Sequence, residues 1–230
     1  MNESRWERWG AASGIAVVVL GAAAMVFERA PVTAADFAAN RTALRTQSML
    51  FLAGAAVTVW FLGSLRSFLI RSEGGTGRLS TVVFGAGIAW TTLNMMAQAF
   101  QLGVASDAEA QAPTALIETM SAVFTVANLP LAVMLVAVAV VSLRHRAFPG
   151  WLGWIAVTAA VAQLLLWLAT VADSGPLASD GWLSFVLYPF FLVWLVPATA
   201  IMMKRAGKAG AGIAAMHRGL SEGHRQPAAT

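Results

Sequence analysis

The stretch from Leu79 to Leu143 decides the fold: LSTVVFGAGIAWTTLNMMAQAFQLGVA (79–105) and LIETMSAVFTVANLPLAVMLVAVAVVSL (116–143), joined by a short polar loop. Each segment is longer than the ~20 apolar residues that a helix needs to cross a bilayer. A backbone in lipid must satisfy its own hydrogen bonds, which helices do. The stretch therefore predicts two antiparallel transmembrane helices.

Four further segments are apolar enough to cross, at residues 9–27, 46–65, 151–172 and 182–203. The composition agrees, since 58% of the 230 residues are hydrophobic and 11% are charged, against about 25% charged in soluble domains. We therefore expect an all-α fold, a polytopic membrane helix bundle with six transmembrane helices in one domain over 1–203. A basic, mostly disordered tail follows over 204–230.

The basic residues predict the orientation of the bundle. Twelve of the fifteen Lys and Arg residues flank the spans on one side, and only Arg29, Arg41 and Arg45 fall on the other. The positive-inside rule then places both termini in the cytoplasm of a multi-pass cell-membrane protein. One alternative is a cleaved signal peptide, because Arg5 and Arg8 precede the first apolar run. It leaves five spans, against the charge count.

Polar side chains recur every three to four residues in both quoted segments, so each set lies on one helix face. We call these eight residues the polar ladder: Thr91, Asn94, Gln98 and Gln101 in the first segment, and Glu118, Ser121, Thr125 and Asn128 in the second. In an antiparallel pair, Gln101 is level with Glu118 and Thr91 with Asn128. The ladder is the candidate functional site.

Two interpretations of the ladder stay open. In the first, a substrate binds to Asn94, Gln98, Gln101, Glu118, Thr125 and Asn128. Pro130, which removes a backbone donor and frees the Val126 carbonyl, is then a gating hinge, and Arg45 pairs with Glu118 at the outer end. In the second, the polar side chains only hydrogen-bond the helices to one another, as membrane helices often do. Gln163 in the fifth span is a candidate extension of the cluster.

Several chemistries lack the residues that they need. The chain has no cysteine, and its three histidines lie outside the apolar spans, which excludes thiolate sites and a haem held between membrane histidines. No HExxH or GxSxG motif occurs. We expect no catalytic residues, metal site or cofactor, and no enzyme activity; a lipid-modifying enzyme would rest on Glu118 alone. The basic residues lie in loops between spans, so the expected partner is the bilayer and not nucleic acid.

Gly10 and Gly14 form a small-xxx-small pair in the first span, which lets another helix approach closely. Packing within the chain and formation of a homodimer are the two interpretations. In the loops, Thr33 and Asp36 have the spacing of a capping box, which predicts a surface helix running into the second span. The glycine-rich segment 71–78 lacks the P-loop pattern and is predicted to be a flexible turn.

Three short segments resemble a family of uncharacterised six-span integral membrane proteins of high-GC Gram-positive bacteria. They are Glu7-Arg8-Trp9-Gly10, Trp60-Phe61-Leu62-Gly63-Ser64-Leu65-Arg66 and Gly77-Arg78-Leu79-Ser80. The resemblance covers about the first hundred residues and implies topology without a reaction. The sequence thus predicts a membrane protein that binds or transports a small molecule or lipid at the ladder. The alternative is a non-catalytic accessory subunit of a membrane complex, held by a membrane-protein partner.

Overall fold

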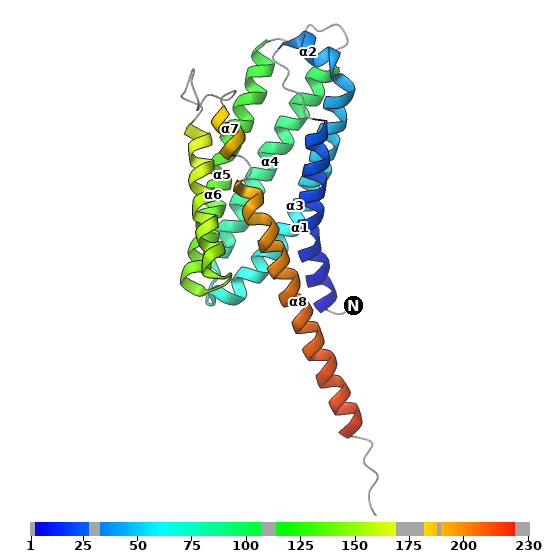
Figure 1. The fold of residues 1–230 in the computed structure, drawn as a ribbon, viewed down its shortest axis with the longest axis vertical. Coiled ribbons are helices and arrows are strands. Elements are labelled where there is room, and N and C mark those ends of the chain that lie inside the picture. Colours follow the sequence, from blue (N-terminus) through cyan, green and yellow to red (C-terminus); the bar gives the residue numbers. More distant parts are fainter. Residues whose placement is uncertain (1–2, 28–32, 107–113, 169–181, 188–189, 224–230) are drawn as a thin grey trace, which may run out of the picture.

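The structure, a computed structural model, describes residues 3–27, 33–106, 114–168, 182–187 and 190–223. Its regular elements over these residues are all α-helices, which confirms the predicted all-α class (Figure 1). The elements in chain order are α1 (Glu3–Val26), α2 (Ala34–Ala39), α3 (Arg41–Glu73), α4 (Arg78–Ser106), α5 (Thr114–His145), α6 (Gly150–Leu168), α7 (Trp182–Leu187) and α8 (Phe190–Gly223).

Six of these helices, α1, α3, α4, α5, α6 and α8, are long and apolar enough to cross a membrane. The prediction of a six-span bundle is therefore confirmed. The sixth predicted span, 182–203, is divided into α7 and α8, and Pro189 between them lies outside the described residues. Residues 169–172, predicted to end the fifth span, also lie outside them. The predicted tail differs too, because α8 continues as a helix to Gly223 beyond the bundle (Figure 1).

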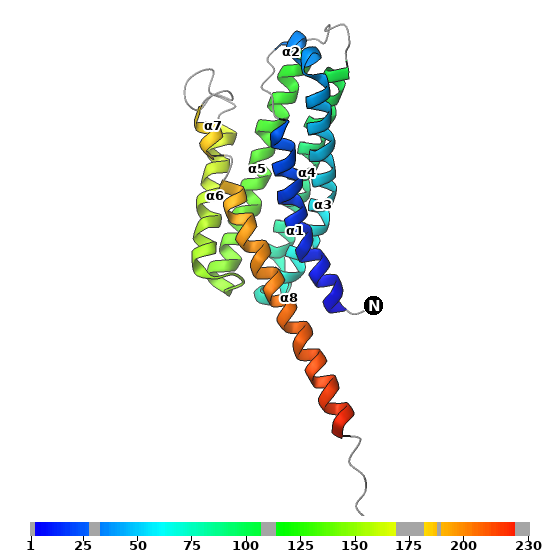
Figure 2. The same cartoon turned by 45° about the vertical axis from the view of Figure 1, so that its right-hand side comes forward.

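Helices α3, α4 and α5 are much longer than a bilayer requires. They contain 33, 29 and 32 residues, or roughly 50, 44 and 48 Å, against about 30 Å of hydrocarbon. Both ribbon views show them reaching past the end of α1 on the side of α2 (Figures 1 and 2). A 20-residue span counted from Leu65, Leu79 and Leu143, next to the arginines at their other ends, leaves the α2 end of α3–α5 outside the hydrocarbon.

The extension of α3–α5 has a small hydrophobic core of its own, covered by α2. Phe37 of α2 and Leu44 of α3 are each 1% exposed there, and Met120 of α5 packs with them. The predicted capping box begins α2: Thr33 N donates to Asp36 Oδ2 (3.0 Å), and Asp36 N to Thr33 Oγ1 (3.3 Å). The helix does not run continuously into the second span, because a turn at residue 40 separates α2 from α3.

The main core lies toward the opposite end, between α3, α5, α6 and α8. Aromatic rings fill it: Phe68 and Phe148 have centroids 4.8 Å apart, and Phe148 meets Trp194 edge-on at 6.4 Å. Edge-on and tilted pairs suit the charge distribution of aromatic rings. These contacts connect α8 to the α5–α6 turn.

Gly10 and Gly14 both lie inside the bundle. A Cβ at Gly10 would lie 2.9 Å from Ser64 Cβ on α3, and one at Gly14 would lie 2.9 Å from Phe61 Cδ2 and from Thr199 Cγ2 on α8. Real Cβ atoms do not approach so closely, so only glycine permits this packing. The glycine pair therefore packs α1 within the chain.

The glycine-rich segment between α3 and α4 forms a defined turn. Gly74, Gly75 and Gly77 have φ of 68°, 59° and 62°, a region that glycine adopts at little cost. The Glu73 carboxylate then accepts from the Leu79 and Ser80 backbone N–H groups, each at 2.8 Å. It thus satisfies amides at the start of α4 that have no partner within the helix.

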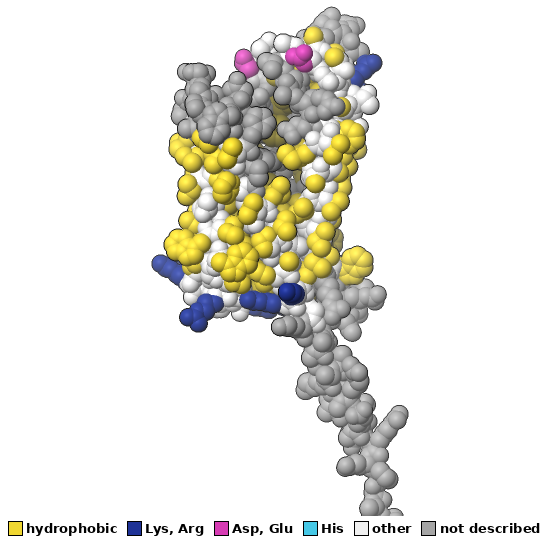
Figure 3. Space-filling view, viewed as in Figure 1, with side chains coloured by type: hydrophobic (Ala, Val, Ile, Leu, Met, Phe, Trp, Pro, Cys, Tyr) yellow, Lys and Arg dark blue, Asp and Glu magenta, His cyan; other side chains and the backbone are white. Residues whose placement is uncertain are grey.

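Charge is divided between the two ends of the bundle (Figure 3). One end, called the basic end below, carries Arg66, Arg71, Arg78, Arg144, Arg146, Lys204 and Arg205. The other end carries Asp36 and Glu118 together with Arg41 and Arg45. A belt of hydrophobic side chains lies between them in Figure 3, as expected for a protein surrounded by lipid.

Candidate functional site

The part of the ladder on α4 nearer the basic end, Thr91 and Asn94, is hydrogen-bonded to its own helix. Thr91 is buried, and its hydroxyl donates to the Gly87 carbonyl oxygen (2.8 Å). The Asn94 side chain is half-buried and donates through Nδ2 to the Trp90 carbonyl oxygen (2.9 Å). Both bonds link residues one turn apart, so neither connects α4 to a neighbouring helix.

The part of the ladder on α5 is more open. Glu118 and Ser121 are exposed, and Thr125 and Asn128 are half-buried. The Thr125 hydroxyl donates to the Ser121 carbonyl oxygen (3.0 Å). The structure describes all eight ladder residues and records no hydrogen bond between the α4 set and the α5 set, although the two helices pack side by side (Figures 1 and 2).

Gln101 makes the ladder's contact with another helix, and it does so toward α3. Its Nε2 donates to Gln47 Oε1 (2.9 Å) and lies 3.4 Å from the Leu44 carbonyl oxygen. Both glutamine side chains are 7% exposed. Sequence reasoning did not include Gln47, although an adjacent polar pair, Gln47-Ser48, at the start of an apolar span was a visible signal.

Other buried polar atoms have no hydrogen-bond partner in the described part of the chain. They include Gln98 Oε1 on α4 and Ser48 Oγ on α3. Gln163, on α6, is 1% exposed and leaves both amide atoms without a partner. No hydrogen bond therefore connects Gln163 to the ladder residues.

The structure does not form the predicted Arg45–Glu118 ion pair, and the predicted hinge at Pro130 lies within a continuous helix. Arg45 and Glu118 are both exposed, and no ion pair within 4.0 Å joins these two described residues. Pro130 lies half-buried inside α5, which continues without interruption from Thr114 to His145. Whether the helix bends there during function stays a prediction.

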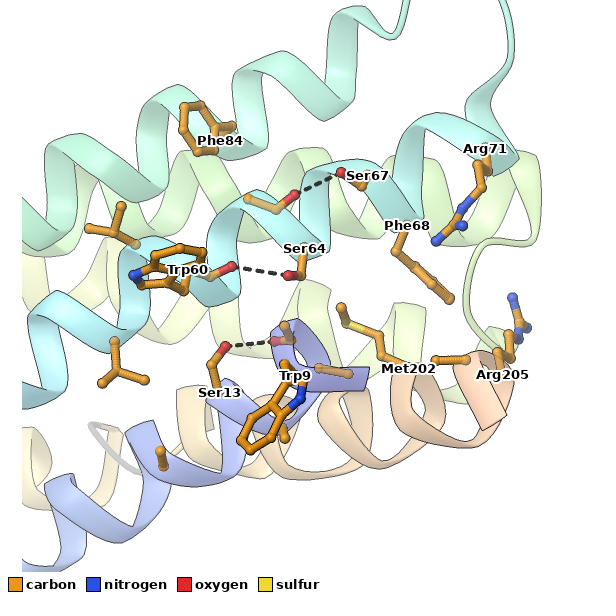
Figure 4. Close-up of a pocket in the computed structure, with 18 of the residues that line it drawn as sticks. Trp9, Ser13, Trp60, Ser64, Ser67, Phe68, Arg71, Phe84, Met202 and Arg205 are labelled. Atoms are coloured by element: carbon orange, nitrogen blue, oxygen red, sulfur yellow. Dashed lines mark hydrogen bonds between the residues drawn. The ribbon is translucent and has the colours of Figure 1, made fainter. Parts of the chain in front are cut away.

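A groove outside the ladder forms a large cavity in the described structure. It has a volume of about 1030 Å³ and lies between α1, α3 and α8, with Phe84 of α4 at its edge. We call it the α1–α3–α8 groove, and Figure 4 shows its lining side chains. Ligand pockets commonly hold about 300–1,000 Å³, so the groove has room for a substantial molecule.

The wall of the groove is mainly apolar. Trp9 and Trp60 lie on either side of it (Figure 4) and are 70% and 64% exposed, so both rings face the surroundings of the bundle. Ser64 and Ser67 donate their hydroxyl protons to carbonyl oxygens one turn earlier, at 3.1 and 3.0 Å. A hydroxyl has one proton to donate, so these serines present no free donor to the groove.

Small residues create the space. A Cβ at Gly63 on α3 would meet nothing within 4 Å, because it would point into an open part of the groove. The lining residues Val57 and Arg71 are fourteen positions apart on α3, or about 21 Å. The groove therefore extends from the arginines of the basic end into the apolar part of α3.

Two arginines, Arg71 of α3 and Arg205 of α8, lie at one end of the groove (Figure 4). The Arg205 Nη1 donates to the Ala147 carbonyl oxygen (2.7 Å), and its Cζ lies 5.2 Å from the centre of the Phe68 ring. Both contacts orient the guanidinium group. The groove is therefore apolar along its length and positively charged at the basic end.

Among the described residues, no group of three or more His, Asp or Glu side chains is arranged to hold a metal ion. The fold and the groove together define a helical, multi-pass integral membrane protein. Comparison of the chain with protein-family models, curated proteins and solved structures finds no match.

Proposed function

We propose that this protein binds the apolar chain of a membrane lipid, or of a similar amphipathic molecule, in the α1–α3–α8 groove. The observation that carries the proposal is a cavity of about 1030 Å³ that runs along α3 and is lined mainly by apolar side chains. The exposed rings of Trp9 and Trp60 flank its opening. A lipid chain thus has a direct path into the groove from the bilayer.

The energetics favour a flexible apolar chain over a polar solute. The hydroxyls of Ser13, Ser64 and Ser67 in the groove are already hydrogen-bonded to their own helices. A polar ligand there would lose hydrogen bonds to water that these serines cannot replace as donors. A lipid chain loses no hydrogen bonds on entering. Its gain comes from close packing against rigid helices, as in the association of membrane helices.

The polar ladder is the less favoured site. Hydrogen bonds within α4 and α5 engage Thr91, Asn94 and Thr125, and the Gln47–Gln101 bond joins α3 to α4. The hydroxyl and amide donors of these residues are thus engaged within the protein, and of these residues Gln101 is the one whose bond reaches another helix. Binding of a substrate there stays a prediction.

Photo-crosslinking tests the proposal. The full-length protein is reconstituted in nanodiscs that contain phosphatidylcholine with a diazirine on one acyl chain, and labelled peptides are identified by mass spectrometry. We expect label to concentrate on the groove segments of α1 and α3. Gly63→Trp should reduce it several-fold, because the indole fills open space without a clash at Cβ.

Gly85→Trp is the matched control. Gly85 lies on α4, is exposed, does not line the groove, and also has nothing within 4 Å of its Cβ position. It should leave groove labelling unchanged. Uniform labelling of all lipid-facing surfaces, unaffected by Gly63→Trp, would overturn the proposal.

Mass spectrometry of the intact assembly in mild detergent tests the accessory-subunit alternative, which requires a stoichiometric protein partner.

We also infer that the basic end faces the cytoplasm, with both termini on that side, because membrane proteins retain most Lys and Arg there. The cysteine-free sequence makes this directly testable. A single cysteine at Thr76, in the exposed α3–α4 turn, should react with a membrane-impermeant maleimide only after cells are opened. A cysteine at Thr33, next to α2, should react in intact cells. The reverse pattern would refute the orientation.

A further inference from the structure

The basic end of the groove has the chemistry of an anion site. Arg71 and Arg205 both line the cavity, and no Asp or Glu is among its described lining residues. The Arg205 guanidinium carries five N–H donors, and the bond from Nη1 to Ala147 is the one hydrogen bond that the structure records for it. Its planar fork matches the geometry of phosphate oxygens.

Arg205 also lines a second, smaller cavity of about 310 Å³ beside the α5–α6 turn, together with Arg146. Arg146 adopts φ of 56° in that turn. Arg205 therefore lines both cavities, with Arg71 in the groove and Arg146 in the smaller cavity. A molecule whose chain lies in the groove would place its headgroup among them.

Building on the proposed function, we propose that the groove selects a phospholipid with an anionic headgroup, whose phosphate contacts Arg71 and Arg205. The headgroup has no positive group of its own, because three nearby arginines already supply positive charge. One acyl chain extends from this end along α3 past Ser64 and Trp60. Phosphatidylglycerol is a simple lipid with this chemistry. Basic pockets between transmembrane helices recognise such headgroups.

Lipid selectivity can be measured with the same crosslinking system. Nanodiscs contain equal amounts of diazirine-labelled phosphatidylglycerol and phosphatidylcholine, distinguished by mass. We expect a wild-type preference for phosphatidylglycerol in the groove of about 25-fold, because each of the two arginines contributes about fivefold near an anionic lipid. Arg71→Gln and Arg205→Gln should each reduce this preference by about fivefold and leave phosphatidylcholine labelling unchanged.

Arg144→Gln is the control, since Arg144 lies at the basic end, is exposed and lines neither cavity; it should leave the preference intact. Arg205 also holds the α5–α6 turn, so Arg205→Gln is accompanied by a thermal unfolding measurement. Should that variant unfold, Arg71→Gln and the wild-type lipid ratio decide the result. Excess inorganic phosphate should not displace the lipid, because the acyl chain contributes to its binding.

The outcomes separate the two proposals. Equal labelling by the two lipids, with both lost in Gly63→Trp, would keep chain binding and refute headgroup selection. Headgroup selection would also be refuted if Arg144→Gln lowered the preference for phosphatidylglycerol as much as Arg71→Gln did. The preference would then reflect the overall positive charge of the surface. Displacement by phosphate alone would assign the arginines to a free anion. Labelling that Gly63→Trp does not change would refute the groove itself.

Discussion

The hydrogen bond between Gln47 and Gln101 connects α3 to α4 where both helices approach the extension beyond the hydrocarbon. Gln101→Met keeps the length of the side chain and removes its donor, which leaves Gln47 Oε1 buried without a partner. A buried polar atom without a partner costs about 1–3 kcal/mol. We expect Gln101→Met to lower the free energy of unfolding by about that amount, and Gln47→Met to have a similar effect.

The double variant is the informative one. With both polar groups replaced, no orphan remains, so its stability should be close to that of the wild type. The two single effects should therefore fail to add, and the coupling energy of the double-mutant cycle should approach the sum of the two single losses. Reversible unfolding in mixed detergent micelles, followed by circular dichroism, measures all four proteins.

Gln163→Met provides the contrast. The same substitution at Gln163 removes an amide that is 1% exposed and has no hydrogen-bond partner. It should be neutral or stabilising, because an unbonded buried amide only adds a desolvation cost. Strictly additive effects of Gln47→Met and Gln101→Met would refute the inferred bond. Equal destabilisation by Gln163→Met would show that these losses reflect general disturbance of packing.

Three further predictions concern single positions. Gly14→Val should lower the free energy of unfolding by about 1–3 kcal/mol, because the larger side chain overpacks the contact of α1. Gly21→Ala should leave it unchanged, because nothing lies within 4 Å of the Cβ position there. Thermal unfolding compares the two variants. Gly77→Ala should be more destabilising than Gly75→Ala in the same assay, since both positions have positive φ but only a Cβ at Gly77 would collide with a side chain. Glu73→Ala should lower stability by about 0.5–2 kcal/mol and speed amide hydrogen exchange at the start of α4; unchanged exchange there would contradict its capping role.

The six spans could be predicted from sequence because their cause is local. Each span needs about 20 consecutive apolar residues, and helix ends followed from charged or turn-forming residues such as Gly74-Gly75. The division of the sixth predicted span was not anticipated. Pro189 lay within an otherwise apolar run, and hydropathy alone does not distinguish one continuous helix from two.

The sequence did not predict which neighbouring helix the polar face of α4 contacts. Spacing of three and four residues places Gln101 on the same helix face as Asn94, but it does not say which neighbour that face meets. Helix α4 packs against both α3 and α5, and Gln101 bonds to Gln47 of α3. The sequence showed a polar face correctly and could not assign its partner.

The α1–α3–α8 groove could not be predicted from the sequence. A cavity is defined by side chains that are missing from a volume, and that volume exists only after α1, α3 and α8 are placed together. Gly63 and Ser64 were visible as part of a quoted segment. Nothing in their order showed that Gly63 faces open space while Gly10, on α1, is in close contact with Ser64.

The small core under α2 experiences a different solvent from the rest of the bundle. Within lipid, apolar side chains gain nothing from leaving water, so helices there associate through close packing. Phe37, Leu44 and Met120 pack together at the α2 end, which from the lengths of α3–α5 we expect to lie beyond the hydrocarbon. There they are held by the hydrophobic effect, which weakens on cooling. Lowering the temperature should therefore loosen the α2 end first, while the membrane-embedded helices stay packed. Cooling should thus weaken the interaction that holds the α2 end and leave the packing of the helices in lipid largely unchanged.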